Sequence, residues 1–196
     1  MIINYNNQEM TQKYQLMAQT IIPRPIAWIV TQNNGITNIA PFSYFMGLSS
    51  QPPTMVVSIG HKSDGTPKDT LKNIRETKKC TICMVTQELM EKMHFSSKEL
   101  DALESEAKQF NIQTDQILDD FPPIIKNTPS AFFCHLHQEI NLKGSKTIPL
   151  IVEIKNQFID DKIVVDKEKF IIDYQPLARV GKSYALLGET LTPPAL

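Results

Sequence analysis

Short apolar segments separated by turn signals dominate the first half of the chain. The segments 26–31, 37–47, 54–60 and 80–85 are rich in β-branched and aromatic residues, a composition typical of strands. Asn33-Asn-Gly35 favours a hairpin turn between the first two, and Pro52-Pro53 ends the second. The stretch from Ala40 to Ser50 continues the strand pattern. We therefore expect residues 37–47 to return as the partner strand of 26–31.

Two regions have a helical pattern. Thr66 can cap a helix that begins at Pro67 and runs to about Thr77, with Asp69 in the first turn. Leu71 and Ile74 would face inward. Residues 88–109 are charged and helical in period, with the apolar positions Leu100, Leu103 and Phe110. Residues 11–20 carry no clear assignment.

The second half of the chain returns to strand patterns. Residues 131–142, 148–160 and 162–165 read as strands, and Asp160-Asp161 would form the turn between the last two. This gives about seven β segments, with one helix (67–77) inserted between strands and a second helical region (88–109) in the middle of the chain. Connections of the hairpin type favour an antiparallel barrel. No Gly-x-Gly-x-x-Gly follows a strand, which disfavours a dinucleotide-binding sheet.

Composition limits the classes of function. The chain has 196 residues, a net charge of −1 and a pI near 6.4, so we expect one domain over residues 1–196 and no nucleic-acid partner. No apolar run reaches the ~18 residues of a membrane helix, and Met1–Met10 does not resemble a signal peptide. Three cysteines cannot all pair. These features predict a cytoplasmic protein without disulfides.

The cysteines allow two interpretations. Cys80-Thr-Ile-Cys83 and Cys134-His-Leu-His137 have the spacing of zinc ligands. Both motifs lie in strand-like segments, where residues three apart point to opposite faces. We therefore predict ordinary packed thiols and no metal.

Alternation within Ala40–Ser50 suggests a first candidate surface. One face would carry small polar residues beside one aromatic, Ser43, Phe45, Gly47 and Ser49, and the other would carry Phe42, Tyr44, Met46 and Leu48. A half-buried strand with its polar side in solvent has the same pattern. Serines beside a glycine also let a flat ring approach the backbone and bond to the hydroxyls.

The turn before the first predicted helix suggests an anion site. Helix N-termini carry unpaired amides and about half a positive charge, and phosphate binds there readily. Lys62 and Lys68 add charge, and Thr66 and Thr70 add hydroxyl donors. Asp69 opposes an anion and is better explained as a cap. A solvated, well-capped surface helix is the alternative interpretation. The four histidines and the acidic pairs lack the context of a catalytic base, so any catalysis would belong to a cofactor.

With these residues the chain resembles the flavin reductase-like, FMN-binding split-barrel family, in particular its flavoprotein oxygenase-associated branch. The resemblance spans residues 20–190. The matching blocks are Pro23-Arg-Pro-Ile-Ala-Trp28, Asn38-Ile-Ala-Pro-Phe-Ser-Tyr-Phe45, Ser49-Ser-Gln-Pro-Pro53, Lys68-Asp-Thr-Leu-Lys-Asn-Ile74, the Ser96-Ser97 region, the strand around Cys134, and Pro176-Leu-Ala-Arg-Val-Gly-Lys-Ser-Tyr184.

The resemblance implies a mainly β fold: a six-stranded antiparallel split barrel with peripheral helices, dimeric, with FMN near the subunit interface. By that analogy three groups of residues contact FMN. Its ring and ribityl chain would meet Ser43, Phe45, Ser49 and Ser50, with Asn38 and Tyr44 at the strand's start and edge; its phosphate would meet Lys62, Lys68 and Thr70; and Tyr184 would cover the flavin.

Two departures from the family pattern affect function. Met46 stands where related chains often carry Asn, and Lys143-Gly-Ser-Lys-Thr147 replaces the Gly-Asp-His of the two-component reductases, whose His is tied to nicotinamide use. We expect an FMN-dependent oxidoreductase that reduces bound or free flavin, with NADH or NADPH as a possible donor, or passes electrons to a partner protein. The alternatives are a non-enzymatic FMN carrier or electron-transfer flavoprotein, and a split-barrel binder of haem or a pyridoxal-type phosphate.

Overall fold

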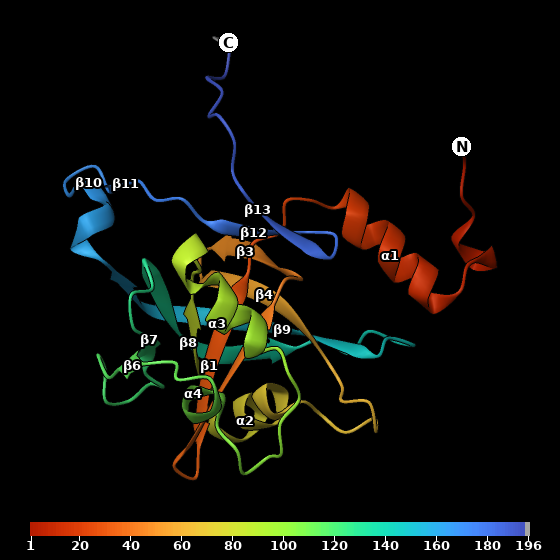
Figure 1. The fold of residues 1–196 in the computed structure, drawn as a ribbon, viewed down its shortest axis with the longest axis horizontal. Helices are drawn as coiled ribbons and strands as arrows, with labels where there is room; N and C mark the ends of the chain where they lie inside the picture. Colours follow the sequence, from red (N-terminus) through yellow and green to blue (C-terminus); the bar gives the residue numbers. More distant parts are fainter. Residues whose placement is uncertain (195–196) are drawn as a thin grey trace.

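A seven-stranded antiparallel sheet forms the centre of the structure, a computed structural model that describes residues 1–194 (Figure 1). Every neighbouring pair in it is antiparallel. The order across the sheet is β2 (Ile36–Phe42), β1 (Ala27–Asn33), β5 (Lys79–Cys83), β8 (Ser130–Glu139), β9 (Thr147–Ile159), β4 (Pro53–Gly60) and β3 (Phe45–Ser50). The predicted mainly β, antiparallel character is confirmed. The predicted count of six strands is wrong, because the sheet has seven.

The sheet curls because its two edge strands are consecutive in the chain. β2 and β3 lie at opposite edges, yet only Ser43 and Tyr44 join them. Three Cα–Cα steps span at most about 11 Å, so the edges must meet at this end. No ladder pairs β2 with β3 among the described residues. The sheet is therefore curled but not closed.

The single strand predicted through Ala40–Ser50 is wrong. The backbone leaves the sheet at Ser43 and Tyr44, where the Tyr44 carbonyl accepts a hydrogen bond from the Ser58 amide. A further irregularity between Gly47 and Ser49 shifts the register against β4. Simple alternation therefore cannot assign one face to this stretch.

The predicted hairpin turn is confirmed. Asn33 pairs with Ile36, and the two residues between them have left-handed backbones, with φ of 48° at Asn34 and 77° at Gly35. Asn and Gly tolerate this conformation at little steric cost. The local sequence therefore sets the register of β1 against β2.

Alternating side chains build two apolar clusters, one on each side of the strands. Trp28, Val30 and Cys83 belong to the first, and Ile29 and Cys80 belong to the second. The predicted parity of Cys80 and Cys83 is thus confirmed. Burial raises the pKa of the Cys83 thiol to about 12, as expected of a packed thiol.

Helix α2 (Asp69–Thr77) packs on the second cluster through Leu71 and Ile74, both fully buried as predicted. Its predicted end at Thr77 is correct, but its predicted start is wrong. Thr66 donates its amide and hydroxyl hydrogen bonds to Asp64 and does not cap the helix. The residue before the helix is Lys68, in an extended conformation.

The predicted long helical region 88–109 is wrong. It contains the turn η2 (Gln87–Leu89) and the short helices α3 (Met90–Phe95) and α4 (Glu106–Gln109), with an irregular segment between them. Leu103, expected on the apolar face, is 84% exposed. Charged side chains within that segment leave too few apolar positions to bury a continuous helix.

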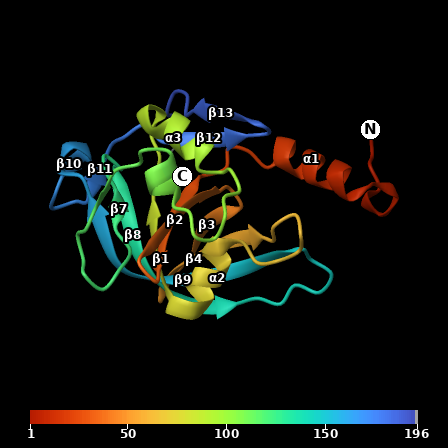
Figure 2. The same cartoon turned by 60° about the horizontal axis from the view of Figure 1, so that its bottom comes forward.

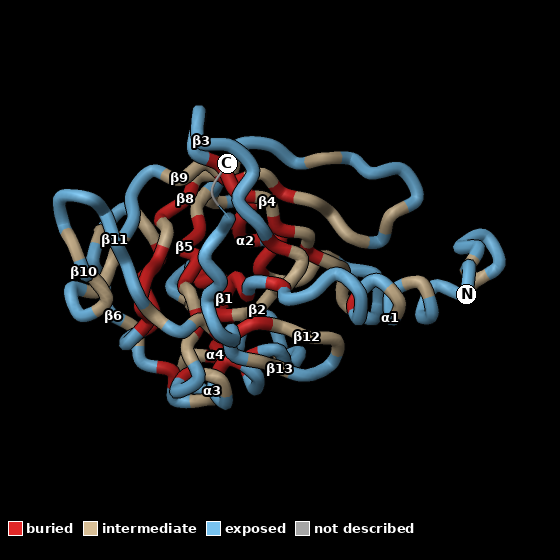
Figure 3. Tube along the Cα trace, turned by 90° about the horizontal axis from the view of Figure 1, so that it is seen from above, coloured by how far each residue is buried: buried red, intermediate tan, exposed pale blue. Residues whose placement is uncertain are grey.

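The N-terminal segment, unassigned from sequence, contains the short 3₁₀ helix η1 (Tyr5–Asn7) and the α-helix α1 (Met10–Thr20). Figures 1 and 2 show α1 reaching out from the side of the sheet, and Ala18 is its one buried residue. Figure 3 shows the contrast between this exposed arm and the buried strands. The arm therefore gains little stability from contacts with the rest of the described chain.

Short elements complete the fold. The predicted strand 162–165 corresponds to β10 (Val164–Asp166), preceded by the turn η3 (Asp161–Ile163) that Asp160 caps. The remaining short strands form three separate pairs. β10 pairs with β11 (Ile171–Ile172), β6 (Thr114–Asp115) pairs with β7 (Ile124–Ile125), and β12 (Leu177–Val180) pairs with β13 (Ser183–Leu186). Of the helices in residues 1–194, none has the length and apolar character needed to span a bilayer.

Candidate functional site

A small cavity lies where β2, the start of α2 and the segment after α3 meet. Its volume is about 30 Å³, room for roughly one or two water molecules. It contains four of the predicted site residues and several that the sequence did not indicate. The lining residues are Asn38, Ala40, Lys62, Lys68, Asp69, Thr70, Ser96, Ser97, Lys98, Glu99, Leu100 and Glu106.

The N-terminus of α2 is open at this cavity. No side chain caps it, and the amides of residues 69–71 find no acceptor within residues 1–194. The aligned peptide dipoles place partial positive charge at these amides. The Lys68 ammonium adds a full positive charge, and it forms no ion pair within residues 1–194. The arrangement suits an anionic group.

Lys62 is already paired. Its ammonium lies 2.9 Å from the Asp69 carboxylate, and its hydrogen bond to that group raises the pKa of Lys62. The pair leaves little net charge at this point of the cavity. Lys68 and the helix terminus therefore supply most of the attraction for an anion.

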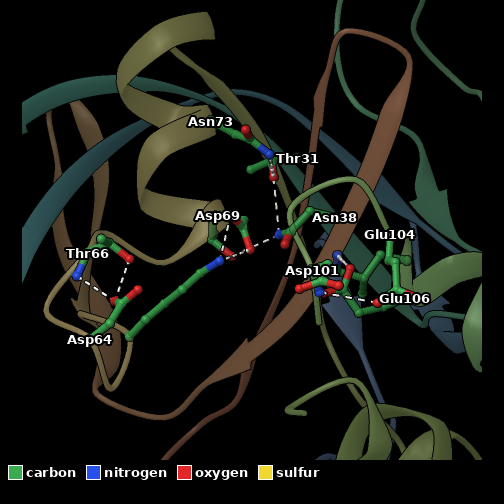
Figure 4. A network of polar contacts seen from close by, with 12 residues as sticks. Thr31, Asn38, Asp64, Thr66, Asp69, Asn73, Asp101, Glu104 and Glu106 are labelled. Atoms are coloured by element: carbon green, nitrogen blue, oxygen red, sulfur yellow. Dashed lines mark hydrogen bonds and ion pairs between the residues drawn. The ribbon is translucent and has the colours of Figure 1, made fainter. Parts of the chain in front are cut away.

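A buried polar network holds β2 against α2 (Figure 4). The Asn38 amide donates to the hydroxyl of Thr70, at 2.9 Å, and to that of Thr31, at 3.3 Å. Asn73 also donates to Thr31, at 3.0 Å. All four residues are buried, and unmade hydrogen bonds would be costly there. The network fixes the floor of the cavity without a ligand.

Sequence reasoning missed Ser97, Lys98 and Glu106 as site residues. Ser96 and Ser97 belonged to a block of family resemblance without an assigned role, whereas Glu106 gave no signal. Glu106 is 6% exposed and accepts a hydrogen bond from the Ile39 amide. Burial raises the pKa of its carboxyl.

The serine face predicted for the strand is divided in the structure. Ser43 and Tyr44 are half-buried in the link between strands, and Phe45 is buried in the second apolar cluster. Ser49 and Ser50 are exposed on β3. A side chain built at Gly47 would meet no atom within 4 Å, so the backbone of β3 is open to an approaching molecule.

A larger cavity of about 1140 Å³ lies beside this link. It is bounded by α1, Tyr44, residues 144–147 and the turn 180–183. The Tyr44 hydroxyl is buried with no hydrogen-bond partner in the described chain, and burial raises the pKa of this phenol. An unsatisfied buried hydroxyl can form a hydrogen bond with a ligand or a second subunit.

Tyr184 lies on β13 and is not among the residues that line the small cavity. Its hydroxyl is 2.9 Å from Nδ1 of His94, and the Arg179 guanidinium lies over its ring, 4.8 Å from the ring centre. His94 precedes Ser96 and Ser97, so the end of α3 connects the two places. The ten predicted residues thus fall into three groups: the cavity, the β3 edge and β13.

Comparison with known proteins decides the family. Residues 17–169 match the model of the Flavin reductase like domain. The chain belongs to this family. An uncharacterized protein from Aquifex aeolicus is 31% identical over 175 residues, with 87% of each chain covered.

Two solved structures are similar over nearly their whole length. The nitrilotriacetate monooxygenase component B from Bacillus cereus is 26% identical, with a TM-score of 0.91 and 98% of each chain covered. The 2-nitrobenzoate 2-nitroreductase NbaA from Pseudomonas fluorescens is 26% identical, with a TM-score of 0.89 and 100% and 96% coverage. A Shewanella frigidimarina structure described as having a split barrel domain is also similar, with 22% identity, a TM-score of 0.84 and 100% of each chain covered. The chain therefore has the split-barrel fold.

Proposed function

We propose that the whole chain is one FMN-binding unit that acts as a flavin reductase-like oxidoreductase. The observation that carries this proposal is the open start of α2 beside Lys68 and Thr70. The terminal phosphate of FMN would accept hydrogen bonds from the amides of residues 69–71. FAD, whose phosphates are internal to the molecule, has no terminal phosphate to place against these amides.

The ring would lie along the open edge formed by the Ser43–Tyr44 link and β3. Gly47 leaves the backbone uncovered, and Ser43, Ser49 and Ser50 carry hydroxyls that can bond to the polar edge and the ribityl chain. Phe45 is buried beneath this edge, so it would support the ring from the core side. Tyr184 would cover the flavin from β13.

The phosphate needs more room than the cavity of about 30 Å³ provides. Residues 97–100 form one wall of this cavity, and the backbone hydrogen bonds of this segment within the described chain are local ones, such as that from the Lys98 amide to the Phe95 carbonyl. Such a segment can move at little cost. We expect it to shift outward when FMN binds.

The bound flavin would supply the redox chemistry, and this chain would hold it and limit access to it. A donor such as NADH or NADPH would approach from the cavity beside α1. The turn there, residues 144–147, carries no histidine. This favours, as second candidate, an FMN carrier that passes electrons to a protein partner. A cytoplasmic location follows from composition and stays a prediction.

Association with a second copy is part of the proposal. Large apolar side chains are exposed along α1 and on the edge strand β3, including Met10 (61%), Tyr14 (54%), Met46 (59%) and Leu48 (52%). An unpaired, apolar edge strand is rarely left open to solvent. A homodimer would cover both surfaces and enclose the ring beside Tyr44.

The first test is whether the purified protein binds FMN. We expect a yellow protein, or quenching of flavin fluorescence at one FMN per chain, and then oxidation of NADH or NADPH with free flavin present. Turnover would discard the carrier alternative, whereas binding without turnover would support it. A haem or pyridoxal-type absorption spectrum in place of flavin, or no uptake of FMN, contradicts the proposal.

Lys68→Ala tests the position of the phosphate. Loss of one charge-assisted hydrogen bond should weaken FMN by about 1–2 kcal/mol, roughly tenfold in Kd. Lys72→Ala is the matched control, because Lys72 lies exposed one turn further along α2. Isothermal titration of both variants measures the difference. Equal affinities would show that the start of α2 does not hold the phosphate.

A further inference from the structure

Glu106 is a buried carboxylate with no basic partner in the described part of the chain. It is 6% exposed, and no lysine, arginine or histidine of residues 1–194 pairs with it. A buried, unpaired acid destabilises a fold unless its hydrogen bonds compensate. Its presence beside the candidate site therefore calls for a role.

The hydrogen bonds of Glu106 and its neighbour Ser105 supply that role. β2 is an edge strand of the sheet, so the outward backbone groups of Thr37 and Ile39 have no strand partner. The Ser105 hydroxyl donates to the Thr37 carbonyl at 2.6 Å, and the Ile39 amide donates to Oε2 of Glu106 at 2.9 Å. Two side chains thus form the hydrogen bonds to the Thr37 carbonyl and the Ile39 amide that a neighbouring strand would otherwise form.

The residue between these two contacts is Asn38. Its side chain donates to Thr70 in the first turn of α2, at 2.9 Å, while the backbone on either side of it is held by Ser105 and Glu106. Asn38, Thr70 and Glu106 all line the small cavity. Any shift of β2 relative to Glu106 would therefore change the position of Asn38 against the open end of α2.

We propose that Glu106 is a positioning residue of the flavin site: by holding the Ile39 amide it fixes the distance between β2 and the start of α2. The proposal rests on the proposed function, because the phosphate of FMN is the group that this distance would serve. The side chain of Glu106 is long enough to bring an acceptor oxygen to the Ile39 amide, and this length is what positions β2. The negative charge of Glu106 is not required for that hydrogen bond.

Three substitutions separate reach from charge. Glu106→Gln keeps an acceptor oxygen at the same reach and removes the charge, so FMN affinity should stay within about threefold of the wild type. Glu106→Asp keeps the charge but is one methylene shorter, so we expect roughly tenfold weaker binding, as for one lost hydrogen bond to the ligand. Glu106→Ala should weaken binding at least as much.

The specific readout is the ratio of FMN to riboflavin affinity, since riboflavin lacks the phosphate. Displacement of β2 from α2 should weaken FMN and leave riboflavin nearly unchanged in Glu106→Asp. General loss of structure would weaken both ligands equally and would overturn the proposal. Glu104→Ala is the control, because the Glu104 side chain is exposed, does not line the small cavity, and within the described chain accepts a hydrogen bond only from the nearby Asp101 amide.

If Glu106→Ala does not fold, the Gln and Asp variants still decide the question. Weaker FMN binding by Gln than by Asp would show that charge and not reach matters, and would contradict the proposal. Wild-type affinity in all three variants would also contradict it while leaving FMN binding intact. Failure of the wild-type protein itself to bind FMN would instead overturn the proposed function.

Discussion

The two halves of the proposed flavin site differ in how completely one chain builds them. At the start of α2, buried hydrogen bonds connect Asn38, Thr70, Thr31 and Asn73, and the cavity floor is fixed. Along β3 and α1, by contrast, large apolar side chains are exposed and Tyr44 carries an unsatisfied buried hydroxyl. The polar groups of the phosphate half find their partners within one chain, whereas the ring half lacks covering groups.

The difference follows from the kind of interaction in each half. Buried polar groups must find partners within the fold, because an unpaired one costs about 1–3 kcal/mol. Exposed apolar surface is tolerated until another molecule covers it. The first half should therefore respond to substitution through folding stability, and the second through association.

The largest expected effect is at Asn38. Asn38→Ala removes donors to the Thr70 and Thr31 hydroxyls and should reduce the free energy of unfolding by about 1–3 kcal/mol. Urea unfolding followed by circular dichroism measures the change. Gln32→Ala is the control, since Gln32 is exposed and bonds to Thr37 at the surface. A loss no larger than that of the control would mean that the network does not stabilise the site.

The β3 edge should show the opposite behaviour. A Met46→Lys, Leu48→Lys double variant should change the intrinsic stability of a monomer by no more than about 0.5 kcal/mol per site, yet halve the mass measured by light scattering. Ile171→Lys, on the separate strand β11 and 46% exposed, should leave the mass unchanged. A wild-type protein that is already monomeric would contradict the interface.

The smallest expected effect is at Lys62. Lys62→Met breaks a partly exposed ion pair with Asp69, which should cost less than about 1 kcal/mol of stability. Since Asp69 already neutralises Lys62, FMN affinity should fall less than in Lys68→Ala. Titrations of both variants at low and high salt compare them. A larger loss at Lys62 would place the phosphate nearer the loop than the helix.

Local sequence signals predicted those parts of the site whose geometry depends on neighbouring residues. The Asn34-Gly35 turn fixes the β1–β2 register, and the apolar spacing of α2 orients Leu71 and Ile74 inward. The blocks of family resemblance indicated Lys68 and Thr70, which the fold brings to the same cavity as Asn38. The positions of these residues follow from the course of the backbone through each element and from which side chains share a face of it.

Local signals failed where other contacts, nearby or distant in the chain, compete with propensity. Thr66 has the chemistry of a helix cap, but Asp64 takes its hydroxyl, so α2 begins later. Residues 40–50 alternate like one strand, but the curl of the sheet bends the chain at Ser43 and Tyr44. Residues 88–109 look helical, yet little apolar surface is available to bury them.

The sequence alone determined the strand-rich pattern, the hairpin, the inward face of α2 and the family, because these depend on neighbouring residues and on short blocks of identity. Only the tertiary structure decided that the sheet has seven strands and that Glu106, 67 positions beyond Ile39, holds the edge of the cavity. Such contacts join residues far apart in the chain. The residues around Glu106 in the sequence do not indicate that its carboxylate binds the Ile39 amide.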